Sequence, residues 1–145
     1  MLRILTLTCL SLAICASGCQ DSDNEIALSG PGEPPMTKND SVIANCYIVQ
    51  AAADAYAAAN NGVYPTHVSE DLPDGRILFD FLPNRGGLVN PYTGLRSEPR
   101  NGYATQVGST GYGPRTSVGT HGYHIDGLGA DWEQLVYLIR EAEVP

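Results

Sequence analysis

The stretch NDSVIANCYIVQAAADAYAAANNGVYPT, residues 39–66, decides the fold because it holds a complete amphipathic helix together with its stop signal. Apolar residues recur in it at spacings of three and four and so share one helix face: Val42, Cys46, Val49, Ala53 and Tyr56. Asp40 or Ser41 can cap the start of this helix. Asn61-Gly62 tolerates the left-handed backbone that closes a helix. We therefore predict a helix over residues 40–60.

Beyond this helix the sequence predicts loops and then three strands. Residues 66–72 can form one helical turn, and apolar residues repeat at helical spacing over 77–82, before Pro83. Glycines and prolines then mark a long loop. The candidate strands are a segment around Tyr112, residues 122–128 and residues 134–140. Short turns between them favour an antiparallel meander, which one helix can cover, so the predicted class is α+β.

The first eighteen residues, MLRILTLTCLSLAICASG, have the layout of a secretory signal. Arg3 precedes an apolar run that is shorter than the about 20 residues of a membrane-spanning helix, and small residues follow it. An ordinary signal cut near Gly18 would explain this layout. The sequence Ala16-Ser17-Gly18-Cys19 also resembles the lipobox of bacterial lipoproteins, which implies that Cys19 becomes the first residue and carries lipid.

Residues 19–38 combine acidic residues with Ser, Gly and Pro and have no sustained apolar period, which is typical of a flexible tether. The lipoprotein resemblance implies that lipid on Cys19 holds this tether to a membrane of the cell envelope. Gln20, and not Asp, follows the cysteine. In lipoproteins of two-membrane bacteria this implies the outer membrane, facing the periplasm or the surface, and not the inner membrane.

Charge and cysteine content argue against a nucleic-acid partner and indicate the role of Cys46. The chain has 8 basic and 16 acidic residues, a net charge of −8 and no basic patch, so it repels phosphate backbones and we expect no nucleic-acid partner. Two of its 4 cysteines leave with the signal and Cys19 takes the lipid. Cys46 is therefore alone, and its place on the apolar helix face predicts a small buried hydrophobe.

Two loop motifs, NNGVYPT at residues 60–66 and NPYTG at residues 90–94, lie between the helix and the strands. In this order, over about residues 39–140, the chain resembles the globular part of type IV pilins and pseudopilins, above all the major pseudopilin of type II secretion. For residues 39–145 the resemblance implies a pilin-like fold. In that fold one long N-terminal amphipathic helix packs on a three- to four-stranded antiparallel sheet with long loops.

The resemblance does not include the prepilin N-terminal segment. Pilins continue their leader directly into a long apolar helix, whereas here Gly18 is followed by Cys19 and a polar tether. We interpret the two motifs as parts of the scaffold. Tyr64 lies between a helix stop and Pro65, so its ring can fold back on the helix while its hydroxyl reaches a polar partner.

Metal-ligand residue types gather near the end of the chain. His121 and His124 stand three apart in a predicted strand and so point to opposite faces, which argues against a zinc site with Asp126 and Asp131. The pseudopilin resemblance implies a calcium loop where Asp126, Asp131 and Glu133 lie. These carboxylates fall short of the about 6 to 8 oxygens that calcium takes. We therefore expect a solvated acidic turn and no cofactor, with calcium as the alternative.

No nucleophile elbow or phosphate-binding loop is present, so an enzyme is not expected. We expect a lipid-anchored envelope protein with a structural or interaction role, linked to a type II secretion or pilus-like apparatus whose components are its protein partners. The alternative is a lipoprotein that binds polysaccharide or peptide through loops of residues 84–121. Exposed aromatic residues, with Trp132 and Tyr112 as the candidates, would favour binding, whereas an uncovered apolar helix face would favour assembly.

Overall fold

The structure is a computed structural model that describes residues 35–117 and 120–143. The predicted signal (residues 1–18), Cys19, Gln20 and the tether up to residue 34 lie outside the described residues. The described part has one α-helix, three short 3-10 helices and two sheets, which confirms the predicted α+β class. Within these ranges no helix combines the length and the apolar character needed to cross a membrane.

Helix α1 (Lys38–Ala59) has 22 residues, close to the predicted span. Its cap is Thr37, not the predicted Asp40 or Ser41. The Thr37 hydroxyl accepts from the backbone N–H of Asp40 at 3.1 Å, and the Asp40 carboxylate accepts from the backbone N–H of Thr37 at 2.9 Å. The helix starts earlier than predicted because this reciprocal capping box places Asp40 in the third helical position. Asn61 (φ 53°) and Gly62 (φ 86°) close the helix in the left-handed region, as predicted.

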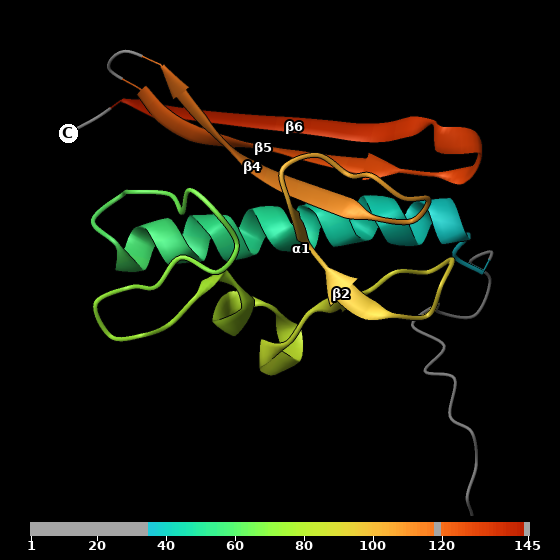
Figure 1. Cartoon of the computed structure of the whole chain (residues 1–145), viewed down its shortest axis with the longest axis horizontal. Coiled ribbons are helices and arrows are strands. Elements are labelled where there is room, and N and C mark those ends of the chain that lie inside the picture. Colours follow the sequence, from blue (N-terminus) through green and yellow to red (C-terminus); the bar gives the residue numbers. More distant parts are fainter. Residues whose placement is uncertain (1–34, 118–119, 144–145) are drawn as a thin grey trace, which may run out of the picture. The chain divides into compact units, whose positions relative to one another are not determined.

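The apolar face of α1 packs on the four-stranded sheet, and residues 61–98 cover another side of the same helix (Figure 1). All of the residues predicted to share that face are buried, and two more alanines join them. The buried helix residues are Val42, Cys46, Val49, Ala52, Ala53, Tyr56 and Ala57. The periodicity of three and four therefore identified the contact face correctly.

The main sheet contains the three predicted strands and one more. Strands β4 (Thr110–Ser117), β5 (Thr120–Leu128) and β6 (Gln134–Glu143) form the predicted antiparallel meander. Strand β3 (Arg100–Asn101) pairs parallel to β4, which gives the order β3-β4-β5-β6. The prediction of a purely antiparallel sheet was therefore wrong, because the loop over residues 102–109 brings the chain back to run beside β3 in the same direction.

The helical spacing predicted over residues 77–82 corresponds to the 3-10 helix η1 (Leu78–Phe81). The predicted loop after it also contains short regular elements, namely the 3-10 helix η2 (Pro83–Arg85) and a small antiparallel sheet of β1 (Leu88–Val89) and β2 (Arg96–Glu98). A third 3-10 helix, η3 (Ala130–Trp132), joins β5 to β6.

The helical turn predicted over residues 66–72 is absent from the structure. The chain makes a single turn there, in which the Glu70 N–H donates to the carbonyl of His67 at 3.1 Å. The Glu70 carboxylate accepts from the Thr66 hydroxyl at 2.7 Å. This side-chain hydrogen bond stabilises the turn and so competes with helix formation.

Four buried tyrosines supply much of the core volume, and each hydroxyl has a partner. Tyr64 and Tyr123 both donate to the Asp54 carboxylate of α1, at 3.1 and 3.2 Å, which confirms the prediction that Tyr64 folds back onto the helix. Tyr112 donates to the carbonyl of Pro65 at 2.8 Å, and Tyr56 donates to the carbonyl of Glu70 at 3.3 Å. These bonds tie the segment after the helix to both α1 and the sheet.

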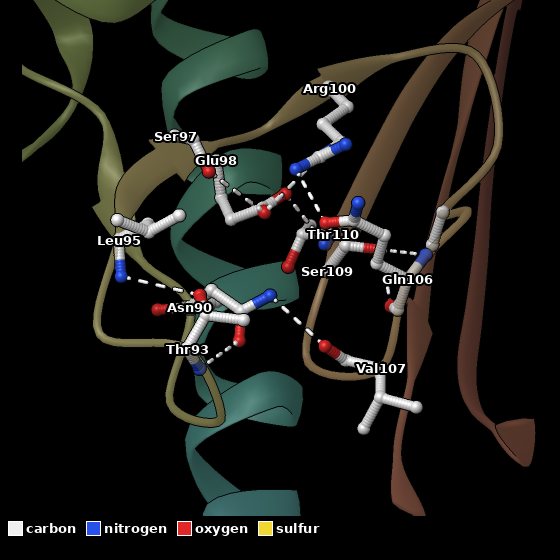
Figure 2. Close-up of polar contacts among 12 residues, drawn as sticks. Asn90, Thr93, Leu95, Ser97, Glu98, Arg100, Gln106, Val107, Ser109 and Thr110 are labelled. Atoms are coloured by element: carbon white, nitrogen blue, oxygen red, sulfur yellow. Dashed lines mark hydrogen bonds and ion pairs between the residues drawn. The ribbon is translucent and has the colours of Figure 1, made fainter. Parts of the chain in front are cut away.

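Asn90, in the predicted NPYTG loop, is buried and uses its side chain to organise its surroundings. Its amide oxygen accepts from the N–H groups of Tyr92 and Thr93 at 2.9 and 3.2 Å, and its amide nitrogen donates to the carbonyl of Val107 at 3.1 Å (Figure 2). Gly108 lies directly against this amide: a Cβ there would stand 2.2 Å from the Asn90 Oδ1 atom. The backbone of residues 107–108 therefore approaches Asn90 only because residue 108 has no side chain.

Gly108 and Gly75 provide a matched pair for testing this approach. Both have a left-handed backbone, with φ of 81° and 82°, but nothing lies within 4 Å of a Cβ built on Gly75. Gly75→Ala should cost about 1 kcal/mol from backbone strain alone, whereas Gly108→Ala should cost about 3 kcal/mol because it also displaces Asn90. The free energies of unfolding from denaturant titration measure the difference. Equal losses in the two variants would show that the contact with Asn90 contributes nothing.

Candidate functional site

The face of the main sheet that points away from α1, here called the outer face, is built from three cross-strand rows. The strand register places Gly111, Asp126 and Tyr137 in one row, Gly113, His124 and Ile139 in the next, and Arg115, Gly122 and Glu141 in the third. Side chains alternate between the two faces of a strand. The core residues Tyr112, Tyr123 and Ile125 therefore belong to the other face, under α1.

Two glycines of β4 leave room for other groups to lie on the outer face. A Cβ on Gly111 would stand 2.3 Å from the Asp126 Oδ1 atom and 2.4 Å from the Ala104 nitrogen. A Cβ on Gly113 would stand 2.4 Å from the His124 Cε1 atom. The loop of residues 102–109 therefore rests on the sheet at Gly111, and the His124 imidazole lies over the backbone at Gly113.

Asp126 holds the loop of residues 102–109 against the sheet. Only 3% of Asp126 is exposed, and its two carboxylate oxygens accept from the Ala104 N–H at 3.0 and 3.2 Å. Burial raises the pKa of Asp126, while the bond from Ala104 and the nearby His124 act in the opposite direction. A buried carboxylate that bonds a loop backbone fixes the position of the residue before it, Tyr103.

His124 lies under Tyr103 and beside Tyr137. The ring centroids of His124 and Tyr103 are 4.3 Å apart with planes at 27°, and those of His124 and Tyr137 are 6.0 Å apart with planes at 31°. Burial lowers the pKa of His124; Asp126 raises it and Arg115 lowers it further. Among the described side chains, the Nε2 atom of His124 is the one buried polar atom without a hydrogen-bond partner.

Tyr103, His124 and Tyr137 together form what we call the aromatic platform. His124 is only 6% exposed, whereas Tyr103 and Tyr137 are 58% and 41% exposed. The neighbouring Tyr137 is the main cause that raises the pKa of Tyr103. Ile139 is 47% exposed and continues this surface along β6. The Arg115–Glu141 ion pair, at 3.2 Å, occupies the neighbouring row.

A buried polar network fixes the two ends of the loop that carries Tyr103. Glu98 is fully buried and accepts from the Thr110 N–H at 3.0 Å, and the Arg100 guanidinium lies 3.4 Å from its carboxylate. Arg100 also donates to the Gln106 side chain at 2.7 Å, so it joins the start of the loop to its end (Figure 2). Because both ends are held in this way, the platform is preorganised.

The predicted metal candidates do not converge. Asp126 is buried on the outer face, whereas Asp131 and Glu133 are exposed at the turn between β5 and β6. His121 is exposed and His124 is buried, on opposite faces of β5 as predicted. In residues 35–117 and 120–143, no three His, Cys, Asp or Glu side chains are placed to hold a metal ion.

Three further residues singled out in the sequence have clear positions. Cys46 is buried, as predicted, and burial raises its pKa to about 12, so it is held as an unreactive thiol. Of the two aromatics proposed as indicators of recognition, Tyr112 is buried in the core and Trp132 is 64% exposed.

Tyr103 and Tyr137 were missed as site residues, although the sequence contains a signal for them. The pattern Gly111-Tyr112-Gly113 places two glycines on one face of a strand, which indicates that another group packs on that face. What that group is depends on a loop contact that no local pattern encodes. The arrangement offers aromatic faces and hydroxyl groups to a ligand.

Comparison with known protein families, curated proteins and solved structures finds no match for this chain.

The lowered pKa of His124 predicts a loss of stability in mild acid. The unfolded chain takes up a proton near the ordinary histidine pKa of about 6.5, whereas the folded chain takes it up only at lower pH. The stabilisation is therefore present above about pH 6.5 and is lost as the pH falls through the folded pKa, with a slope of at most about 1.4 kcal/mol per pH unit. His124→Phe keeps a ring under Tyr103 and should remove this slope.

Free energies of unfolding measured between pH 7.5 and 5 test this prediction. Asp126 contributes with the opposite sign, because a raised carboxyl pKa adds stability that is present at low pH and lost as the pH rises through that pKa. The comparison is therefore the difference between wild type and His124→Phe. His121→Phe, at an exposed position of the same strand, is the matched control. If His124→Phe and wild type lose stability in parallel, His124 does not titrate as described.

Proposed function

We propose that this chain is a lipid-anchored cell-envelope protein that presents a pilin-like interaction domain on a flexible tether. The observation that carries the proposal is the order of segments in the sequence: a signal ending in Ala16-Ser17-Gly18-Cys19, then a polar tether, then a single folded region that begins with a helix. More than one acyl chain on one cysteine gives stable anchoring where a single chain does not.

The described architecture supports the pilin-like part of the proposal. A single long helix lies against one face of an antiparallel meander, and an irregular segment connects the two. Both loop motifs of the resemblance are tied to that helix. Tyr64 of the first motif bonds Asp54, and Tyr92 of the second bonds Asn39. These contacts support the interpretation of both motifs as parts of the scaffold.

The same proposal extends to location and partners. Gln20 favours the outer membrane, and the pseudopilin resemblance favours components of a type II secretion or pilus-like apparatus as protein partners. The acidic charge of −8 argues against nucleic acid. The role we propose is structural or interactive and not enzymatic.

A second candidate, a lipoprotein that binds a ligand, is favoured by the exposed aromatic platform. Tyr103 belongs to the loops from which the sequence predicts ligand binding, and Tyr137 lies beside it on β6. By contrast, the exposed part of α1 offers Tyr47 and alanines and no large aliphatic side chain. The side chains thus favour recognition on the outer face over assembly through the helix.

Lipid attachment can be tested by substituting each cysteine that remains after signal removal. Cells that express the chain are labelled with an alkyne analogue of palmitate, and the labelled protein is read on a gel. We expect Cys19→Ser to abolish labelling and to move the protein from the membrane to the soluble fraction. Cys46→Ala, the matched control, should keep the label, because Cys46 is buried in the fold. A labelled, membrane-bound Cys19→Ser chain would refute the anchor.

The proposed sorting of the protein to the outer membrane can be tested by substituting Gln20 in a two-membrane bacterial host. Gln20→Asp should move most of the protein from outer-membrane to inner-membrane fractions on a density gradient, whereas Gln20→Asn should leave it in place. An identical distribution of the two variants would remove the assignment to the outer membrane without affecting lipid attachment.

A further inference from the structure

The aromatic platform has one covered side and one open side. The Tyr103 ring stacks on His124, which in turn lies over the backbone at Gly113, so the inner face of the Tyr103 ring is occupied. The exposed 58% of Tyr103 therefore belongs to its outer face and edge. Tyr137 adds a second exposed ring whose plane is within 31° of the His124 plane. Two exposed aromatic side chains thus lie on the same side of the sheet.

The apolar part of the platform is small. The exposed fractions of Tyr103, Tyr137 and Ile139 together amount to on the order of 300 Å² of apolar surface, given about 150–250 Å² for each large side chain. A ligand with a footprint of one or two rings matches an apolar surface of this size.

The groups around the rings indicate the chemistry of that ligand. The tyrosine hydroxyls and the exposed Arg115–Glu141 pair offer both hydrogen-bond donors and acceptors beside the rings. A net charge of −8 disfavours a polyanion. A pyranose ring has both features that this surface requires. Its apolar C–H face can stack on an aromatic ring, and its hydroxyls can form hydrogen bonds with the surrounding polar groups.

We propose that the outer face of the sheet binds a neutral polysaccharide, with pyranose rings stacked on Tyr103 and Tyr137. This inference rests on the second candidate function, ligand binding, and names its ligand class. His124 and Asp126 are positioning residues: the first supports the Tyr103 ring, and the second holds the loop backbone at Ala104.

Affinity electrophoresis of the full chain in detergent tests the proposal. Native gels contain dissolved mannan, xyloglucan or hydroxyethylcellulose, and alginate serves as the polyanionic comparison. We expect at least one neutral polysaccharide to retard the protein, and Tyr103→Ala and Tyr137→Ala to weaken the binding about tenfold or more. Tyr47→Ala is the matched control, since Tyr47 is 54% exposed but lies on α1, and it should bind like wild type.

A second substitution separates loss of binding from loss of fold. Tyr103→Leu keeps an apolar side chain over His124 but has no aromatic face, so it should fold as wild type does and still lose binding. The proposal is overturned if no neutral polysaccharide retards the protein or if alginate alone does. Unchanged binding in the Tyr103 variants overturns it as well. So does photo-cross-linking from position 103 that captures a protein in place of a glycan.

The proposed lipid anchor and the proposed polysaccharide binding can be tested independently of each other. Cys19→Ser should leave retardation by polysaccharide unchanged, because the platform belongs to the described domain and not to the tether. A lipid-anchored chain that binds no polysaccharide would overturn the ligand class and leave the anchor standing.

Discussion

One carboxylate, that of the half-buried Asp54 of α1, accepts hydrogen bonds from the hydroxyls of both Tyr64 and Tyr123, and the rest of the fold depends on this shared contact. Tyrosines fill much of the core, and a buried hydroxyl without a partner costs about 1–3 kcal/mol. Asp54 satisfies one hydroxyl from the irregular segment and one from β5. It therefore fixes the helix, the irregular segment and the sheet relative to one another. An aliphatic core of the same volume has no such directional bond and would fix the irregular segment less precisely.

Because the tyrosines pack on the helix side of the sheet, strand alternation determines which residues lie on the outer face. The alternation of β4 and β5 sends Tyr112 and Tyr123 under the helix, so Gly113 and His124 necessarily face outward. The loop of residues 102–109, held by Asp126, covers part of this outer face, while its one aromatic side chain, Tyr103, stays largely open to solvent. The same strand pattern that builds the core therefore also builds the platform.

Local patterns predicted the helix and the meander because each element has a characteristic spacing of apolar residues in the sequence. Spacings of three and four identified the buried face of α1, and alternation identified the strands from β4 to β6. The parallel strand β3 and the site were not predictable in this way. Both depend on contacts between residues distant in sequence, such as Glu98 with Thr110 and Ala104 with Asp126. In sequence, a buried carboxylate such as Glu98 or Asp126 cannot be distinguished from an exposed one.

The proposed anchor and the proposed ligand reinforce each other through valency. A platform of two tyrosines provides only a few kcal/mol of binding to one ring, since each aromatic contact contributes about 0.5–1.5 kcal/mol beyond its burial. A polysaccharide repeats its rings, and the proposed lipid anchor would gather many copies of the chain on one membrane. Each bound copy would then raise the effective concentration for the next copy. Weak sites on anchored chains can thus hold a polymer that a single soluble domain would release.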